Sequence, residues 1–176
     1  MPLPPDIEAH LADISQAASR TLATLPDMWH NAQADLTRGL TLAQSRRVPE
    51  QQIEALYASA VRLCQVEQFE KALPIALLLN AYAGDQARIL FLTGTCLQRL
   101  GLAAPAAQLY AQCLQADAQY LAALYRLGEC MAAINEMAGA ADVFEAVAGM
   151  GWNDQQHLEL RSMAEDKLAA LRAAGW

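Results

Sequence analysis

Apolar residues recur at an interval of about 34 residues through the middle of this chain, between Ile53 and Met150. No stretch shows the alternating pattern of a β-strand. Two antiparallel helices can cross closely only where one side chain is very small, which explains why small residues hold the same place in successive intervals. The pattern therefore predicts three pairs of antiparallel helices. The residues that keep the interval are Ala60, Gly94 and Gly128; Ala72, Ala106 and Ala140; Leu56, Leu90 and Leu124; Leu63, Leu97 and Met131; and Ala76, Tyr110 and Phe144.

Glycine and proline mark the expected helix ends. Gly101 is typical of the residue that follows a helix, and Pro105 suits the first turn of the next one. Pro74 lies inside an apolar run, where it removes a backbone hydrogen bond, so we expect a late helix start or a mild kink there. A repeat of about 34 residues that folds as helix, turn and helix is typical of tetratricopeptide repeats, so the expected fold class is all-α, an α-solenoid of three such pairs. The expected helices span residues 51–67, 69–82, 86–100, 104–116, 120–134 and 137–148.

Residues 1–48 do not keep the repeat spacing. Asp6 and Asp27 can each cap a helix, and the first of these helices carries a stripe of Ile and Leu. This N-terminal helical extension could cover the first repeat, pair with a second copy as a dimerisation region, or stay apart from the repeats. The residues alone leave these alternatives open.

The repeats occupy residues 49–152, and a last helix is expected within residues 153–176. Terminal units of a solenoid need a polar outer side, and the acidic and basic residues of this segment supply one. We therefore expect a C-terminal capping helix that packs back on the third repeat. The residues expected to make that contact are Leu158, Met163, Leu168 and Leu171.

Charge and composition exclude several kinds of function. The chain has 12 basic and 19 acidic residues, and a net charge of −7 repels a phosphate backbone. The N-terminus lacks the basic and apolar regions of a signal peptide, and the longest apolar run, 73–83, is shorter than the ~20 residues that span a bilayer. We expect neither nucleic-acid binding nor membrane insertion. Hydrophobic residues make up 55% of the chain, which leaves apolar surface for a protein partner.

The cysteines and histidines give no sign of catalytic chemistry. Cys64, Cys96, Cys113 and Cys130 form no CxxC pair, so we expect them to pack as small hydrophobic residues in a reducing compartment. The three histidines lie outside the repeats, and the sequence has neither a glycine-rich phosphate loop nor a GxSxG motif. The expectation is a protein that is not an enzyme and that has no catalytic residue, metal or cofactor.

Stacked helix pairs offer a concave wall lined by the first helix of each pair. The second, fifth, ninth and twelfth positions of each repeat should point into it. Tyr57, Phe91 and Tyr125 then form one row of aromatic side chains, which can hold an extended peptide because rings bury a large area at a low entropic cost. The alternative is that this row packs inward as ordinary core. The candidate groove residues are Tyr57, Val61, Cys64, Arg88, Phe91, Thr95, Gln98, Tyr125 and Glu129.

Several segments resemble a specific family. The segments are 53–60, Gln68-Phe69-Glu70-Lys71-Ala72, the Gly94-Thr95-Cys96 stretch within 91–98, and 127–131, in which Glu129-Cys130 follows a small residue. Together they resemble the class II type III secretion chaperones, over residues 41–167 or so. The repeat spacing alone does not require the Gly-x-Cys and Glu-Cys pairs, so the resemblance is more specific than generic repeat character.

This resemblance implies a function. Such chaperones hold an extended N-terminal segment of hydrophobic translocator proteins in the concave groove, in the bacterial cytoplasm, and prevent premature association and degradation. It also implies a homodimer. Two departures stand out, because several family members have aromatic residues where this chain has Val61 and Cys64, and because the N-terminal extension is long. The groove side chains implied by the resemblance are Tyr57, Val61, Cys64, Phe91, Thr95, Gln98, Tyr125 and Glu129.

The alternative function is a repeat scaffold or regulator that binds other cytosolic proteins. A repeat protein that binds C-terminal tails usually needs a basic clamp for the terminal carboxylate. Arg88 is the only basic residue at the groove positions, which disfavours that version.

Overall fold

The computed structural model describes residues 48–83, 86–150 and 155–176, without the side chain of Gln156. The chain divides into two units, Met1–Val48 and Pro49–Trp176, and the second unit holds all the described helices. The helices expected in the N-terminal extension, and the dimerisation region expected there, lie outside the described residues.

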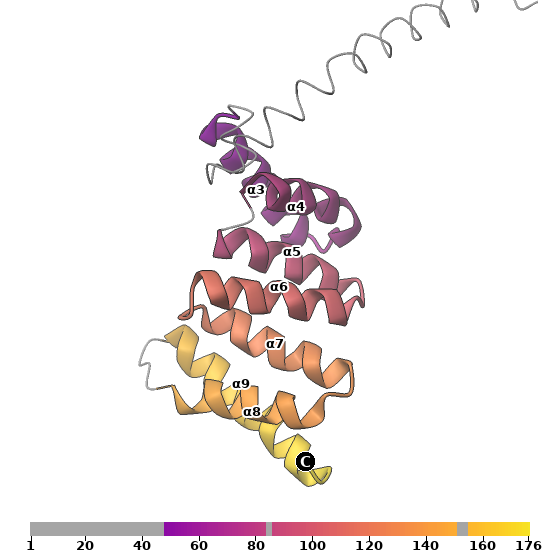
Figure 1. Ribbon diagram of the computed structural model, residues 1–176, viewed down its shortest axis with the longest axis vertical. Helices are drawn as coiled ribbons and strands as arrows, with labels where there is room; N and C mark the ends of the chain where they lie inside the picture. The colour runs from indigo at the N-terminus through magenta and orange to yellow at the C-terminus, as the bar shows by residue number, and fades with distance from the viewer. Residues whose placement is uncertain (1–47, 84–85, 151–154) are drawn as a thin grey trace, which may run out of the picture. The chain divides into compact units, whose positions relative to one another are not determined.

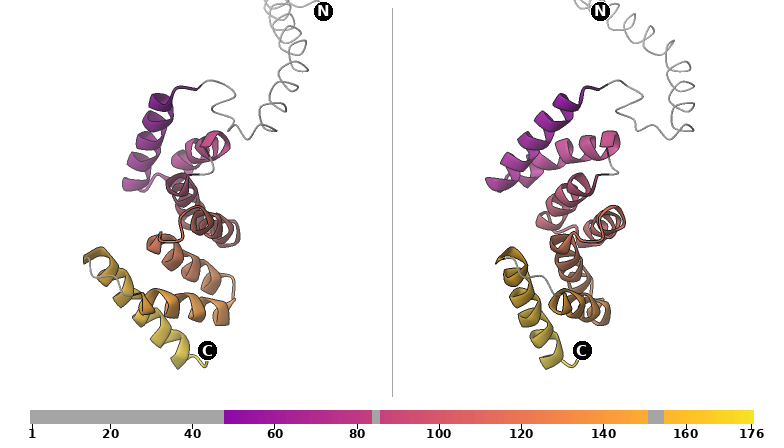
Figure 2. Two further views of the ribbon diagram at one scale, coloured as in Figure 1. Left: turned by 60° about the vertical axis from the view of Figure 1, so that its left-hand side comes forward. Right: turned by 90° about the vertical axis from the view of Figure 1, so that its left-hand side faces the viewer.

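The second unit is a succession of helices in which each packs on its neighbours in the chain (Figure 1). The last helix packs on α8 and also reaches α7, and the two turned views in Figure 2 show it beside α8. The all-α fold of helix pairs is confirmed, and each observed end lies close to the expected one. The described residues contain no strand and no helix that is long and apolar enough to cross a membrane. The helices are α3 (Glu50–Gln65), α4 (Phe69–Ala83), α5 (Ala87–Arg99), α6 (Ala103–Ala116), α7 (Leu121–Ala133), α8 (Met137–Gly149) and α9 (Gln155–Ala173).

The small residues of the first helices lie where the two helices of a pair approach most closely. A Cβ atom added to Gly94 would lie 2.9 Å from Cε1 of Tyr110, and one added to Gly128 would lie 2.9 Å from Cε1 of Phe144. Ala60 is fully buried at the same position of the first repeat, where the partner helix carries Ala76 in place of an aromatic ring. Repeats two and three thus combine a glycine with a large ring, whereas repeat one combines two alanines.

In all three repeats the turn between the two helices has the same backbone conformation and the same hydrogen bond. Gly101 has a φ of 81°, and Glu67 and Asn135, one repeat before and after it, have φ values of 57° and 67°. The next residue in each repeat donates its N–H to the carbonyl five residues back, as in Leu102 to Leu97 at 2.9 Å. This Schellman motif satisfies carbonyls that the helix end leaves free. The sequence identified it only at Gly101, because glutamate and asparagine are less typical of this backbone conformation than glycine.

Pro74 lies inside α4, which begins at Phe69, so of the two alternatives expected there, a late helix start or a mild kink, the late start is wrong. The N–H groups of Lys71 and Ala72 both bond to the carbonyl of Gln68, which fixes the first turn before the proline is reached. Pro74 and Glu70 are exposed, so water can reach the carbonyl that the missing N–H would have bonded.

The C-terminal helix packs on the third repeat, as expected, and Leu168 and Leu171 make the expected contacts. Ala164 and Leu168 are buried in a cluster with Phe144, and Leu160 and Leu171 pack against it. The expectation for Leu158 and Met163 is wrong, because their side chains are 44% and 47% exposed. Residues five apart point in clearly different directions on a helix, whereas residues three or four apart share a face.

Candidate functional site

An open hollow of about 360 Å³ lies between the first helices of repeats one and two. Tyr57, Val61 and Cys64 contribute from α3, where spacings of four and three residues place them on one face. Phe91 and Thr95 contribute from α5 in the same register. The structure therefore brings these predicted residues together. The complete lining is Tyr57, Val61, Cys64, Gln65, Phe91, Leu92, Thr95 and Tyr120.

Tyr120 is one of three lining residues that sequence reasoning missed, together with Gln65 and Leu92. It caps the N-terminus of α7, and its ring lies 4.9 Å from that of Phe91, centroid to centroid. Phe91 also meets Tyr110 at 5.6 Å, so it stands between two tyrosines. Burial raises the pKa of Tyr120 to about 12. The equivalent position of repeat two is Gln86, which is not aromatic, so no repeated pattern pointed to Tyr120.

Arg88 does not line the hollow but lies over the ring of Tyr57, with its guanidinium carbon 4.8 Å from the ring centroid. Its Nη1 donates to Oε2 of Glu54 at 2.9 Å, its Nη2 pairs with the other carboxylate oxygen, and its Nε donates to Gln86 at 3.0 Å. The hydrogen bond from Arg88 lowers the pKa of Glu54, and burial raises the pKa of Tyr57. Arg88 is thus engaged by neighbouring side chains and holds one face of the Tyr57 ring.

A chain of polar contacts runs from the hollow toward the C-terminal helix. The hydroxyl of Tyr110 donates to Oε1 of Gln98 at 2.8 Å and lies 3.3 Å from the hydroxyl of Thr95. Nε2 of Gln98 donates to Glu129 at 3.1 Å. The Glu129 carboxylate also accepts a hydrogen bond from Arg126 at 2.8 Å. Gln98 and Glu129, both predicted groove residues, therefore bond to each other beside the hollow, and neither is among its lining residues.

Tyr125, the third aromatic residue of the predicted row, is buried, with 1% of its surface exposed. Its ring packs on Phe144 at 5.6 Å, in the cluster that α9 completes. Burial, with the Glu129 carboxylate adding to it, raises the pKa of Tyr125 to about 12. The structure does not bring Tyr125 to the hollow, and the row divides into two rings that line it and one that does not.

The cysteines occupy two kinds of environment. Cys96, Cys113 and Cys130 are buried in the helix contacts, whereas Cys64 is half-buried on the wall of the hollow. Sγ of Cys113 donates to the carbonyl of Ala87 at 3.2 Å. Within the ranges that the structure describes, no group of three or more side chains is placed to hold a metal ion.

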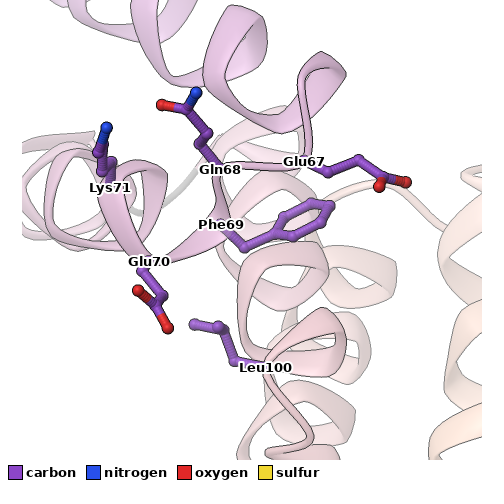
Figure 3. A pocket seen from close by; sticks show the side chains of 6 residues that line it. All are labelled: Glu67, Gln68, Phe69, Glu70, Lys71 and Leu100. Carbon is purple, nitrogen blue, oxygen red and sulfur yellow. The ribbon is translucent and has the colours of Figure 1, made fainter.

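A second hollow of about 300 Å³ lies where α3 turns into α4, beside the end of α5 (Figure 3). Phe69 forms part of it, and the guanidinium of Arg99 lies 4.9 Å from the Phe69 ring centroid. Arg99 also pairs with the exposed Glu67 at 3.1 Å. Apart from Phe69, this second hollow is lined mainly by polar residues, and none of the predicted groove residues lies in it. The other lining residues are Glu67, Gln68, Glu70, Lys71 and Leu100.

Several solved structures with the same arrangement of helices are type III secretion proteins. A type III secretion complex from Aeromonas hydrophila matches with a TM-score of 0.74 and 24% identity, over 81% of this chain and 95% of that chain. PcrH from Pseudomonas aeruginosa matches with a TM-score of 0.65 and 25% identity, over 71% and 95%. The Yersinia enterocolitica chaperone SycD, crystallised with a peptide of the translocator YopD, matches with a TM-score of 0.68 and 20% identity, over 73% and 98%.

PcrH is also known in complex with the chaperone binding region of PopD. The resemblance that the motifs indicated is therefore confirmed, because the chain is similar in structure to translocator chaperones of type III secretion. No protein-family model matches the chain, and no curated protein matches it by sequence.

Proposed function

We propose that this chain is a non-enzymatic chaperone that binds an extended N-terminal segment of a hydrophobic type III secretion translocator. The observation that carries the proposal is the open hollow between α3 and α5, whose lining includes Tyr57, Val61 and Phe91. The structural likeness to chaperones crystallised with translocator segments supports the same function.

The hollow suits apolar side chains of an extended segment. Its volume of about 360 Å³ lies within the range of about 300–1,000 Å³ that is common for binding sites. Every second side chain of an extended segment points the same way, so successive anchors reach the hollow while the others face water. The rings of Tyr57, Phe91 and Tyr120 provide rigid contact area, and Thr95 and Gln65 provide polar groups beside them.

Binding of this kind explains how a translocator is kept apart from its partners. An apolar segment held in the hollow is not free to associate with another chain or to be degraded. The proposal places the protein in the bacterial cytoplasm as a homodimer, with residues 1–48 as the dimerisation region, 49–152 as the binding repeats and 153–176 as the cap. SycD has been crystallised as dimers, which supports the homodimer.

The proposal is tested by co-expression with a translocator encoded nearby, followed by titration of a labelled peptide from its N-terminal region. Tyr57→Ala and Phe91→Ala should each weaken peptide binding at least tenfold and reduce the yield of soluble translocator, because each removes a ring from the hollow. Phe69→Ala is the matched control, since it removes a ring outside the hollow, and it should bind as the native chain does. Equal binding by all three variants would refute the proposed site.

A scaffold that binds C-terminal tails is less well supported. The part of the hollow's lining that the structure describes contains no basic residue, and Arg88 is held by Glu54. A terminal carboxylate would therefore meet no cation in the hollow. A peptide whose affinity is unchanged by C-terminal amidation agrees with the chaperone, and one that binds only with a free carboxylate agrees with the scaffold.

A further inference from the structure

Two cysteine side chains lie against each other at the wall of the hollow. Sγ of Cys64 on α3 and Sγ of Cys96 on α5 are 3.5 Å apart. The sulfur atoms of a disulfide lie about 2.05 Å apart, so these atoms would have to approach by roughly 1.5 Å. They belong to different helix pairs, so a bond between them would join the first repeat to the second.

The two thiols differ in access. Cys64 is half-buried and lines the hollow, so a small molecule that enters the hollow meets its sulfur. Cys96 is buried behind it, and burial raises the pKa of the Cys96 thiol to about 12. Because the thiolate is the attacking species, Cys64 is placed to react first and Cys96 to react second.

We propose that Cys64 and Cys96 are a thiol modification site, at which a small disulfide oxidant such as oxidised glutathione generates an intramolecular disulfide. The Cys64 thiolate attacks one sulfur of the oxidant, and a mixed disulfide forms while one glutathione thiolate leaves. Cys96 loses its proton to water and attacks Sγ of Cys64, which releases the second glutathione thiolate. The two protein thiols lose two electrons and two protons, and the oxidant is reduced to two thiols.

The bond would act on the hollow directly. It draws the Cys64 sulfur away from the lining and toward α5, which changes the shape of the wall of the hollow beside Val61. It also ties α3 directly to α5, which α4 separates along the chain. In a reducing cytosol such a bond is transient, as is typical of redox-sensing cysteines.

The experiment treats the native, full-length chain with oxidised glutathione, quenches it with acid, unfolds it and labels the remaining thiols with a maleimide. Trypsin places the four cysteines on four different peptides, so mass spectrometry can assign every pair. We expect two fewer labels on the treated chain and a linked pair of peptides, 63–71 with 89–99. Full labelling of both cysteines, or a glutathione adduct that persists on Cys64 of the native chain, would overturn the proposal.

Single substitutions separate the two steps. Cys96→Ala should hold a stable glutathione adduct on Cys64, since the second thiol is missing, and absence of that adduct would mean that the oxidant does not reach Cys64. Cys64→Ala, at the less buried position, should keep its remaining thiols reduced, and oxidation of Cys96 there would contradict the order of reaction. Cys113→Ala is the matched control for a buried cysteine outside the pair. It should give the same disulfide as the native chain, and its loss there would count against the proposed pair.

A further consequence rests on the proposed function. A translocator peptide in the hollow should shield Cys64 and slow disulfide formation at least tenfold. It should also lower the equilibrium constant for disulfide formation at least tenfold, so by reciprocity the oxidised chain should bind that peptide at least tenfold more weakly. If the peptide binds the reduced chain but does not slow oxidation, the coupling is wrong. If the peptide does not bind at all, the proposed function fails while the disulfide assay still stands.

Discussion

Tyr57 and Tyr125 hold the same position in the first and third repeats, but their surroundings differ because different helices pack beside them. Beside Tyr57 lies α5, which places the polar Arg88 over one face of the ring and leaves the other side toward the hollow. Beside Tyr125 lies α9, whose Ala164 and Leu168 are buried in the same cluster as the ring. The first-repeat ring is therefore available to a ligand, and the third-repeat ring belongs to the core.

Phe91 is intermediate between these two cases. Its ring packs between Tyr110 and Tyr120, yet it still lines the hollow. Of the three equivalent rings, those of the first two repeats are thus partly exposed and that of the third is buried. In a solenoid each repeat contacts only its neighbours, so the next repeat decides whether a position binds a ligand or stabilises the fold.

The largest expected effect comes from truncating the buried ring. Tyr125→Ala should lower the free energy of unfolding by about 3–5 kcal/mol, because it leaves a cavity beside Phe144. Tyr57→Ala should lower it by only about 1 kcal/mol, because part of the ring is already in water. Urea unfolding followed by circular dichroism measures both. Similar losses for the two variants would show that the two ends of the row do not differ as the structure indicates.

The close contact between the two helices of the third repeat provides a second test of how tightly that repeat is packed. Gly128→Ala should cost about 1–2 kcal/mol, because the new Cβ atom meets the Phe144 ring and the strain exceeds the gain in helix propensity of about 1 kcal/mol. Gly149→Ala is the control, since a Cβ atom added there meets nothing within 4 Å, and it should leave stability nearly unchanged.

A second substitution identifies the cause. Phe144→Leu should cost less in the Gly128→Ala background than in the native chain, since the smaller side chain makes room for the added methyl group. Additive losses in this double-mutant cycle would mean that the Phe144 ring is not what makes the glycine necessary. Thermal or urea unfolding of the four proteins supplies the comparison.

The helix pairs could be predicted because their spacing is a local property of the sequence. The wall formed by Tyr57, Val61, Cys64, Phe91 and Thr95 could be predicted for the same reason, since each residue keeps its place in the repeat. Whether a side chain at a given repeat position is covered or exposed could not be predicted, because the residues that cover it do not follow the repeat spacing.

Three observations illustrate this limit. Tyr120 has no aromatic equivalent in repeat two, so it was missed. The burial of Tyr125 depends on α9, which lies beyond the last repeat and whose inner face was assigned wrongly at Leu158 and Met163. The backbone of Glu67 adopts a conformation that its residue type does not favour, and only its distance from Gly101 along the chain could have identified it.

Alkaline titration should distinguish the two tyrosines. Burial raises the pKa of Tyr125 to about 12, above the value of about 10 expected in the unfolded chain. The stability that this group contributes is complete below pH 10 and is lost as the pH rises toward 12, because the unfolded chain releases the proton first. Tyr125→Phe should therefore reduce the alkaline loss of stability more than Tyr57→Phe does, since the Tyr57 ring is only half-buried. Urea midpoints measured between pH 9 and pH 12 check the difference, and equal curves for the two variants would contradict it.

The smallest effect is expected at the turns. Asn135→Gly should raise the free energy of unfolding by about 0.5–1 kcal/mol, because glycine adopts a φ near 67° without steric cost. Glu67→Gly should gain less, because it also removes the exposed ion pair between Glu67 and Arg99, which is worth roughly 0.2–1 kcal/mol. Gly101→Ala should lose about 1 kcal/mol at the equivalent turn of the second repeat. Thermal unfolding gives the ranking, and a loss of stability in Asn135→Gly would show that the asparagine side chain, and not its backbone, determines the third turn.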